Sequence, residues 1–325
     1  MSDGSDTNGL TYADVGVDID ESEAATAALV DAFGGFDADA YAGVIDLGDQ
    51  LLGIATDGVG TKLLVADAVG DHSTVGIDCI AMNVNDLVAM GIEPIGFVDY
   101  LAIDEPDEAL TAALGHGLAV GAAEAGIDLL GGETAVLPEI ITGYDLAGTC
   151  VGVAPPDALL DAGAAPGDRL VGVPSTGIHS NGLTLARKAV ARVGAFDDPF
   201  PPDPDRTIGA ELLRPTAIYA DLLDPLSEFA HAAAHVTGGG WHNLERMGEH
   251  HYAIDDPLPA QPVFSFVQDA GGISDAEMHR TFNMGTGFVM ATRARTAESL
   301  AAAVDGQIIG EVTAGSGVTI RGLEL

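Results

Sequence analysis

Short apolar runs that end in glycine-rich turns recur along this chain, and helix-like segments stand between them. Leu51–Thr56 runs into Asp57–Gly60, and Ile127–Leu130 runs into Gly131–Glu133. Glycine lets the backbone turn tightly between a strand and a helix. Alternating strands and helices are typical of α/β proteins, so we expect an α/β fold of the α+β type with mixed sheets.

Apolar spacing and turn residues place the individual elements. The predicted helices cover 21–33, 76–90, 108–125, 181–192, 211–222 and 275–281, and the predicted strands cover 43–47, 51–56, 94–103, 127–130, 144–153, 169–174, 287–291, 307–311 and 317–321. Proline and glycine gather between Pro155 and Gly167, which is typical of a linker. With 325 residues, the chain is therefore predicted to form two domains, residues 1–155 and 166–325.

Acidic residues dominate the charge. The chain has 50 acidic and 12 basic residues, a formal net charge of −38, yet 47% of it is hydrophobic. That apolar fraction excludes a disordered chain. An acidic shell repels itself in dilute buffer, but at molar salt the Debye length falls to about 3 Å. The composition therefore indicates a halophilic protein, and it argues against a nucleic-acid partner, which needs clustered Lys and Arg.

Nothing in the sequence indicates a membrane or an export route. The first residues are acidic and polar, without an apolar segment behind them, and no apolar run reaches 18 residues. Cys79 and Cys150 lie in apolar runs without a CxxC partner, so we expect buried thiols. These features predict a cytoplasmic protein with no membrane partner.

Lys62 is the only Lys or Arg between Met1 and Asp168. It ends the segment Thr56–Lys62, where glycines allow a close backbone approach to a ligand. Backbone N–H groups in such a turn can hold phosphate oxygens, and a lysine adds a positive charge. The alternative is a structural turn with a solvated lysine. The scarcity of basic residues favours the phosphate role, although the spacing is not that of a Walker A loop.

Three carboxylates stand among apolar or glycine neighbours, where a solvated acid would be wasteful. Asp57 ends a strand, Asp86 lies in a largely apolar helix, and Glu133 follows Gly131-Gly132. Ligands collect at the carboxyl ends of strands in open sheets, and Mg²⁺ takes one or two carboxylates with phosphates and water. These acids are the predicted magnesium ligands, with Asn83 and Asn85 as supporting donors.

The segment from Ser175 to Gly182 joins a predicted strand to a predicted helix. We expect Ser180 or Asn181 to cap that helix and its free N–H groups to form an anion site. His179 is placed to donate to a phosphate or to transfer a proton near neutral pH. The alternative is a capping loop with an incidental histidine.

A second glycine-rich segment follows His235. Thr237 and Gly238–Gly240 stand before Trp241, and the three glycines would allow a ligand to approach the backbone. A flexible turn explains the same pattern equally well.

Together these segments resemble the phosphoribosylformylglycinamidine cyclo-ligases, also called AIR synthetases. The matching segments are Tyr12–Asp18, Thr56–Lys62, Gly76–Asp78, Asn85–Leu87, Pro94, Asp99-Tyr100, Gly131–Thr134, Asp145–Gly148, His179–Gly182, Leu213–Thr216, Thr237–Gly240 and Arg280–Gly285. Each is weak alone, but their order along nearly the whole chain is highly specific.

The resemblance implies a two-domain fold whose N-terminal domains bind ATP and pair into a homodimer. ATP and Mg²⁺ are the implied cofactors, with K⁺ as a further candidate, and formylglycinamidine ribonucleotide is the implied substrate. Its formyl oxygen would be phosphorylated, and the amidine nitrogen would then close the ring, giving aminoimidazole ribonucleotide, ADP and phosphate.

The family motifs also assign roles to residues as hypotheses. The catalytic set is His179, Lys62 and Asp57, and the metal set is Asp57, Asp86 and Glu133. The cofactor-binding set is Asp57, Gly58, Gly60, Thr61, Lys62, Asn85, Asp86, Gly132, Glu133 and Thr134. The substrate set is Ser175, His179, Ser180, Asn181, His235, Thr237, Gly238 and Gly239.

One segment departs from the family pattern. The family carries a longer, basic, glycine-rich stretch before its Gly-Gly-Phe, whereas Gly34-Gly35-Phe36 here follows an acidic segment without Lys or Arg. Which N-terminal residues contact nucleotide is therefore left open. The alternatives are thiamine-monophosphate kinase and formylglycinamidine ribonucleotide synthetase of the same superfamily, or a non-catalytic acidic module that binds cations.

Overall fold

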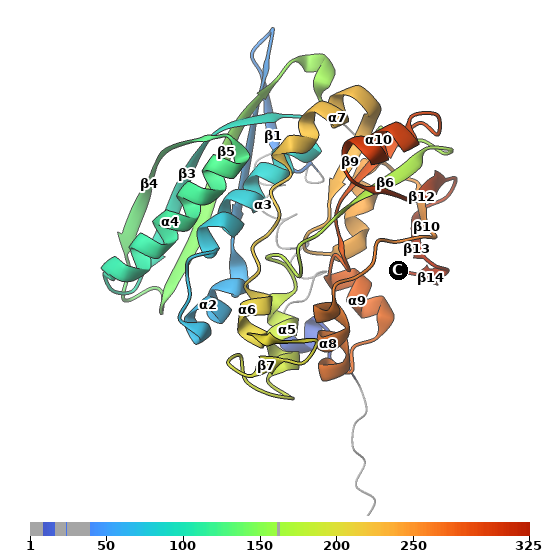
Figure 1. Cartoon of the computed structure of the whole chain (residues 1–325). Helices are drawn as coiled ribbons and strands as arrows, with labels where there is room; N and C mark the ends of the chain where they lie inside the picture. The colour runs from blue at the N-terminus through green and yellow to red at the C-terminus, as the bar shows by residue number, and fades with distance from the viewer. Residues whose placement is uncertain (1–8, 17–23, 25–39, 161–162) are drawn as a thin grey trace, which may run out of the picture.

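Two mixed β-sheets stand side by side in the computed structural model, which describes residues 9–16, 24, 40–160 and 163–325 (Figure 1). The first sheet has the strand order β1-β2-β5-β3-β4, and the second has the order β14-β13-β10-β12-β6-β11-β9. The described part of the chain has no helix long and apolar enough to cross a membrane.

The first sheet contains one parallel pair and is otherwise antiparallel. β3 runs parallel to β4, while the pairs β1–β2, β2–β5 and β5–β3 are antiparallel. Its strands are β1 (Gly43–Asp46), β2 (Leu51–Gly58), β3 (Glu93–Ile103), β4 (Asp128–Val136) and β5 (Tyr144–Ala154).

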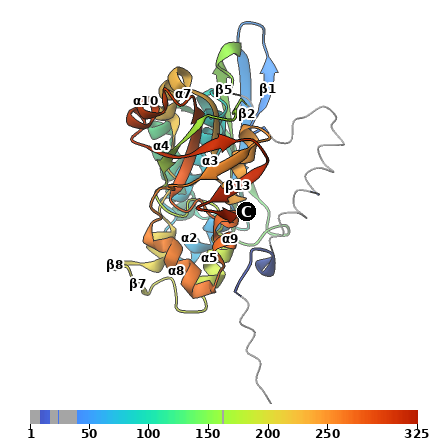
Figure 2. The ribbon, with the colours of Figure 1, turned by 90° about the vertical axis from the view of Figure 1, so that its right-hand side faces the viewer.

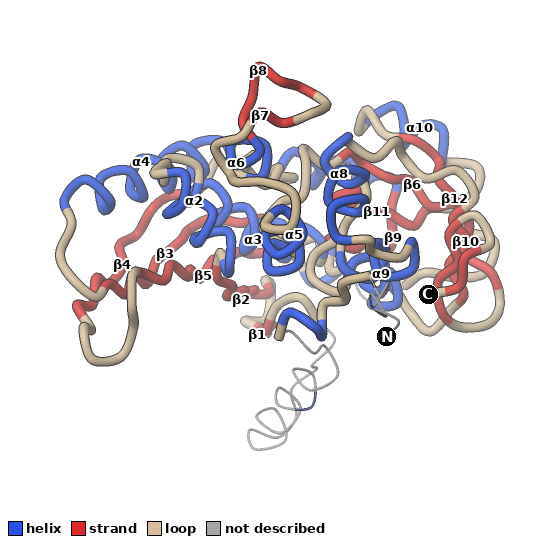
Figure 3. Tube along the Cα trace, turned by 90° about the horizontal axis from the view of Figure 1, so that it is seen from below, coloured by secondary structure: helices blue, strands red, loops and turns tan. Residues whose placement is uncertain are grey.

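Two long helices, α3 (Val75–Ala89) and α4 (Glu108–Ala125), cover one face of this sheet (Figure 3). They pack closely because small residues meet where they cross: a Cβ on Gly76 would lie 2.1 Å from the Leu118 nitrogen. Asp107 caps α4 by accepting from two backbone N–H groups, and Gly126 ends it in the left-handed conformation. α3 also packs against β2 and β5, and it borders the second half of the molecule, which comprises residues 163–325.

The other face of the first sheet has no described helix over it (Figure 3). Apolar side chains are exposed on this face. Val98 and Tyr100 of β3 are 40% and 46% exposed, and Leu130 of the edge strand β4 is 64% exposed.

Helices on both sides enclose the second sheet. Its strands are β6 (Arg169–Pro174), β9 (Ala230–His235), β10 (His251–Ile254), β11 (Thr286–Thr292), β12 (Gln307–Thr313), β13 (Gly317–Ile320) and β14 (Leu323–Glu324). The α-helices of this half are α5 (Leu183–Val190), α6 (Ile208–Leu212), α7 (Leu223–Phe229), α8 (Pro262–Gly271), α9 (Asp275–Thr281) and α10 (Ala297–Ala303). A small hairpin of β7 (Pro199–Phe200) and β8 (Asp203–Thr207) projects beside α6.

The two halves share a core. A single cluster of buried apolar side chains includes Ile80 and Val84 of α3 together with Tyr219 and Phe288 of the second half. The short helix η1 (Ala13–Val15) also lies against α5, and the Leu10 N–H donates to the Gly271 carbonyl in α8 (Figure 2). The N-terminal segment therefore packs on the second half of the molecule.

The remaining short elements connect these layers. α2 (Leu63–Val69) follows the 3₁₀ turn η2 (Gly60–Lys62) directly after β2, and η3 (Pro156–Ala158) begins the link between the halves. Two further 3₁₀ segments, η4 (Ala220–Leu222) and η5 (Gly240–Met247), precede α7 and β10.

The predicted α/β class with mixed sheets is confirmed, and most predicted elements exist within a few residues of their bounds. The predicted helix over 211–222 is wrong: α6 ends at Leu212, since Pro215 lacks an N–H and disfavours helix in the residue before it. The strand predicted over 127–130 continues to Val136 through both glycines. The helix predicted over 21–33 lies outside the described residues, apart from residue 24.

Candidate active site

The loop after β2 forms one wall of a cavity of about 260 Å³. Asp57 is the last residue but one of β2. Its N–H donates to Asn83 Oδ1 at 2.9 Å, and its own Oδ1 accepts from the Gly58 N–H at 2.7 Å. Gly60 turns with φ of 69°, which a side chain would strain. The predicted residues Asp57, Gly58, Gly60 and Thr61 all line the cavity.

The start of α5 forms the facing wall. Ser180, Asn181 and Gly182 line the cavity, and Gly182 is the N-cap with φ of 72° and no side-chain cap. The prediction that Ser180 or Asn181 caps this helix is therefore wrong. Gly182 offers no side chain to cap α5, and the Tyr12 hydroxyl accepts from the Gly182 N–H. The N–H groups that follow are left for an anion, the role that the sequence analysis expects of this helix start.

Four further residues complete the lining, and the sequence analysis gave none of them a site role: Tyr12, Val59, Met82 and Thr184. Thr184 Oγ1 lies 2.9 Å from Thr61 Oγ1, so the two walls touch through a hydroxyl pair. Tyr12 comes from the N-terminal segment, where only the family motif Tyr12–Asp18 drew attention to it. Met82 and Thr184 follow helical spacing and have no distinguishing signal.

Asp57 and Asp86 form an acidic pair near the cavity. Burial, and then the charge of Asp86, raise the pKa of Asp57 to about 6. Asp86 Oδ1 lies 2.9 Å from His235 Nδ1, and this contact orients the imidazole. No set of three or more His, Cys, Asp or Glu side chains suited to a metal ion occurs among the described residues. Within one chain, two carboxylates are thus available to a cation here.

His235 and Asn85 lie where α3 meets the second half. Asn85 Nδ2 is 3.3 Å from His235 Nε2 and donates to the Ala217 carbonyl, and Asn85 Oδ1 accepts from the Tyr219 N–H at 2.8 Å. Both side chains are buried, so in this conformation they join the two halves.

The glycine loop after β9 approaches the same region. A Cβ on Gly238 would lie 3.3 Å from Asn181 Oδ1, which places the predicted residues Asn181 and Gly238 side by side. Asn243 fastens the loop by donating to the carbonyls of Gly238 and Gly240, and Thr237 Oγ1 donates to Asn243 at 3.5 Å. The loop that contains Gly239 is therefore held in place, which favours neither the ligand-binding nor the structural interpretation.

His179 is buried, with φ of 64°, and does not line the cavity. Its Nε2 accepts from the Thr176 N–H at 3.0 Å, so the proton of the neutral ring belongs on Nδ1. Burial, followed by the charges of His235 and Lys62, depresses the pKa of His179 well below its usual value. The prediction of a histidine that exchanges a proton near neutral pH is not supported by this environment.

Lys62 is fully buried and forms an ion pair. Its Nζ donates to Asp78 Oδ1 at 2.7 Å and to the Arg214 carbonyl at 2.6 Å. The glycine loop before it faces the cavity, but the ammonium points into the interface between the two halves. This geometry differs from the sequence prediction of a lysine that contacts phosphate.

Glu133 lies apart from the other predicted ligands. It pairs with Tyr100 across β3–β4, in the row that runs through Ala147 to Gly58, so three strand spacings separate it from β2. Asp57 belongs to the next row and therefore to the opposite face of the sheet. Gly132 packs against Asp99, and Glu133 itself is exposed.

The other members of these sets also lie outside the cavity. Thr134 continues the edge strand β4, on the row beside Glu133. Ser175 is buried in the loop after β6, where its Oγ donates to Asn283 Oδ1 at 2.8 Å. Within one chain, the cavity thus brings together neither Ser175 nor the Gly132–Thr134 segment with Asp57.

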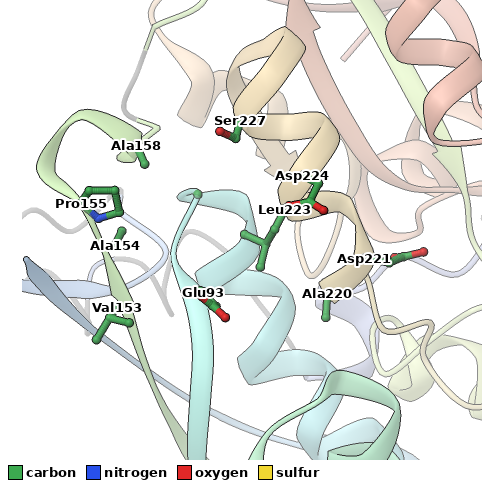
Figure 4. A pocket seen from close by; sticks show the side chains of 11 residues that line it. Glu93, Val153, Ala154, Pro155, Ala158, Ala220, Asp221, Leu223, Asp224 and Ser227 are labelled. Atoms are coloured by element: carbon green, nitrogen blue, oxygen red, sulfur yellow. The ribbon is translucent and has the colours of Figure 1, made fainter.

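A second cavity of about 390 Å³ contains none of the predicted residues. Glu93, Val153 and Pro155 of the first half face Ala220, Leu223 and Asp224 of the second (Figure 4). Its carboxylates are exposed, and no buried polar group points it out as a ligand site.

Comparison with known proteins agrees with this fold. The model of the AIR synthase related protein N-terminal domain matches residues 39–154, and that of the C-terminal domain matches residues 165–322. The chain thus has the two domains of the AIR synthase related proteins.

Curated relatives narrow this class. The chain is 46% identical to the phosphoribosylformylglycinamidine cyclo-ligase of Methanosarcina acetivorans over 97% of its own length and 98% of the relative's. It is 43% identical to the enzyme of the same name from Pyrococcus furiosus over 86% of its length and 87% of the relative's. The chain belongs to the phosphoribosylformylglycinamidine cyclo-ligase family, an ATP-dependent ligase family of purine biosynthesis.

Solved structures share the fold at lower identity. A protein from Thermus thermophilus superposes with a TM-score of 0.65 at 24% identity, covering 93% of this chain and 97% of that one. Thiamine monophosphate kinase from Aquifex aeolicus reaches a TM-score of 0.69 at 17% identity, covering 95% and 99%. Because identity is so low, these likenesses concern the fold alone.

Proposed function

We propose that this protein closes the imidazole ring of aminoimidazole ribonucleotide, with ATP and formylglycinamidine ribonucleotide as substrates. The γ-phosphoryl group passes to the formyl oxygen, the amidine nitrogen attacks that carbon, and phosphate leaves with its oxygen. Family membership at 46% identity supports this reaction. Such chemistry requires positioning and charge neutralisation more than acid–base catalysis.

The observation that carries the proposal is the cavity between Asp57–Thr61 and Ser180–Gly182. One wall offers backbone N–H groups and a carboxylate, and the other offers the uncapped start of α5. This combination suits phosphate groups on both sides with a bound cation between them. A solved relative of the same fold was crystallised with AMPPCP and TMP, which supports nucleotide binding by this architecture.

Asp57 and Asp86 fit a magnesium ion. Burial, and then the charge of the neighbouring Asp86, raise the pKa of Asp57 to about 6, and a divalent cation between the two carboxylates would remove their repulsion. Mg²⁺ takes one or two carboxylates and completes its shell with water and phosphate oxygens. When bound, the ion would neutralise phosphate charge; Asp57 and Asp86 would hold it, and His235 would orient Asp86.

The open face of the first sheet supports the expected homodimer. Exposed apolar side chains of β3 and β4 lie there together with Glu133. A second copy covering this face would bury them and would bring Glu133 into the assembly interface. A requirement for K⁺ stays a proposal.

Formation of ADP and aminoimidazole ribonucleotide from ATP, Mg²⁺ and formylglycinamidine ribonucleotide in molar KCl tests this function. We expect equal amounts of both products. Asp57→Asn should lower turnover at least about 100-fold, since a preorganised charge that stabilises a developing one is typically worth that much. The control is Asp269→Asn, an exposed carboxylate of α8, which should keep turnover within about twofold.

Thiamine monophosphate as the acceptor distinguishes the related kinase activity. ADP formed with thiamine monophosphate but not with formylglycinamidine ribonucleotide would replace the proposed reaction. Folded protein without magnesium-dependent affinity for ATP would instead favour an acidic cation-binding module.

A further inference from the structure

Residues 213–219 form an irregular strap between α3 and the loop that contains His179. The sequence predicts a helix here, but α6 ends at Leu212 and η4 begins only at Ala220. An extended segment must find partners for its backbone groups outside itself. The strap finds them on two sides.

On one side the strap is fastened to α3 and its N-cap. Thr74 Oγ1 donates to the Leu213 carbonyl at 3.1 Å. Asp78 Oδ1 accepts from both the N–H and the Oγ1 of Thr216, each at 2.7 Å. Asn85 binds the strap again at Ala217 and Tyr219. Successive members of this set are four and seven positions apart, which places them along one face of the helix.

On the other side the strap holds the loop that reaches the cavity. Thr176 Oγ1 donates to the Pro215 carbonyl at 2.7 Å, and the Ala217 N–H donates to His179 Nε2 at 3.4 Å. Thr216 Oγ1 lies 3.2 Å from Ser180 Oγ, and Ser180 lines the cavity. Thr216 is therefore the link between α3 and the wall formed by α5.

Lys62 completes this link from the opposite wall of the cavity. The Lys62 ammonium contacts Asp78 Oδ1 and the Arg214 carbonyl, and both partners are part of the strap's attachment. Asp78 Oδ1 thus accepts three hydrogen bonds, while Asp78 Oδ2 is buried without a partner among the described residues. Both side chains of the ion pair are 0% exposed.

A buried ion pair adds little net stability compared with apolar residues of similar volume, because desolvation offsets the attraction. The pair instead fixes geometry, because its two buried charges are satisfied only when their hydrogen-bond partners keep one arrangement. Here Lys62 directly follows Gly60 and Thr61, which line the cavity. Gly60 and Thr61 therefore form one wall of the cavity, and the next residue, Lys62, holds the strap that positions the opposite wall.

We propose that Lys62 and Asp78 are a positioning pair, which fixes the strap and thereby sets Ser180 and the start of α5 opposite the Gly58–Thr61 loop. Lys62 acts from the interface between the two halves and does not touch the phosphates. The inference deepens the proposed function, because it names what aligns the two walls for the phosphoryl transfer.

The test compares Lys62→Met, Asp78→Asn and the double variant. Each single change leaves one buried group of the pair without its partner, and we expect kcat to fall at least about tenfold. The double variant carries neither charge and keeps an oxygen for Thr216, so kcat should recover to within about fivefold of the unmodified protein. The dissociation constant of a non-hydrolysable ATP analogue with Mg²⁺ should change less than about threefold throughout. Lys188→Met, at the other lysine of the chain and on an exposed side of α5, is the matched control and should be unaffected.

If Lys62 instead contacted the phosphates of ATP, the variants would behave differently. The double variant would then be as inactive as Lys62→Met, and both would bind the ATP analogue at least about tenfold more weakly. That outcome would overturn the proposal.

Amide exchange provides a readout that does not depend on turnover. Exchange at Thr176, Thr216 and Ala217 should accelerate in Lys62→Met and recover in the double variant, whereas Val289 in β11 should be unchanged. If the unmodified protein shows no cyclo-ligase activity, the function fails while these amides still test the pair. Should Lys62→Met not fold, Thr216→Val, which removes one hydroxyl and no charge, must accelerate the same amides; unchanged exchange there would contradict the proposal.

Discussion

Residues 1–168 and residues 169–325 divide the charge of the chain unevenly. The first stretch holds 31 of the 50 acidic residues and one of the 12 basic residues, which leaves −30 of the total of −38. The second stretch carries the remaining −8. The only basic side chain of the acidic half is buried against Asp78. That half therefore has no free lysine or arginine, so backbone N–H groups, hydroxyls and a metal ion are left to hold any phosphate it binds.

The second half contributes a different chemistry to the same cavity. Its wall consists of the start of α5 with Ser180 and Asn181, and burial depresses the pKa of His179 well below its usual value. The acidic half thus attracts a cation through Asp57 and Asp86, while the second half offers dipoles to an anion. The net charge of each half therefore does not determine which charge the cavity wall of that half attracts.

The largest expected effect concerns salt. Below about 1 M KCl the self-repulsion of the acidic shell is no longer screened at short range, and we expect the protein to unfold or dissociate. Residues 1–168, with a net charge of −30, should lose their structure at a higher salt concentration than residues 169–325. Hydrogen exchange in β2 and β5 should accelerate more than about tenfold over that in β6 and β11 as KCl falls. Equal melting temperatures in low and molar KCl would contradict this.

The next effect sharpens the cation side of the comparison. The pKa of Asp57 is raised from its ordinary value to about 6, so its ionised form destabilises the fold above pH 6, and this cost disappears as the pH falls toward 4. Magnesium requires the ionised form, so its affinity should be about tenfold weaker at pH 5 than at pH 7.5. Titration of Mg²⁺ against the melting temperature in molar KCl measures this.

The Asp57→Asn variant is the matched test of that assignment. It should bind Mg²⁺ weakly and equally at both pH values, whereas Asp269→Asn should retain the pH dependence. A pH dependence that survives in Asp57→Asn would assign the titration to another group.

The smallest effect concerns His179 on the anion side. Because its pKa is depressed well below the usual value, its ring does not titrate between pH 6 and 8. His179→Asn, in which asparagine tolerates the φ of 64°, should lower kcat without changing the shape of the pH–rate profile in that range. A profile that loses an ionisation near pH 6.5 in this variant would show that the histidine exchanges a proton after all.

Local sequence predicted the cavity loops well. The loop after β2 and the start of α5 are specified by glycine and polar residues within a few positions, and both line the cavity; that they bind phosphate stays a prediction. Most of the first sheet was also predictable, since its strands alternate between buried and open faces.

What the sequence did not predict depends on contacts between distant residues. The direction of the Lys62 side chain is set by Asp78 and by a carbonyl 152 residues away, so a solvated and a buried lysine look alike in the sequence. Apolar residues at helical spacing led to the prediction of a helix over 211–222, whereas residues 213–219 form the strap and take hydrogen bonds from α3. Two glycines suggested a turn before Glu133, although the strand continues through them because β3 pairs with it.

The edge strand β4 has a consequence for solubility. One side of β4 is unpaired among the described residues, and Leu129 and Leu130 are exposed on it between Asp128 and Glu133. Charged residues beside an apolar edge normally keep it from adding strands of other molecules. At molar salt, charge repulsion is screened beyond about 3 Å. The conditions that suit the acidic shell therefore also weaken the protection that charged residues give to this edge. Covering of this edge by the second copy of the proposed homodimer would restore that protection, which would make assembly and solubility one requirement for this chain.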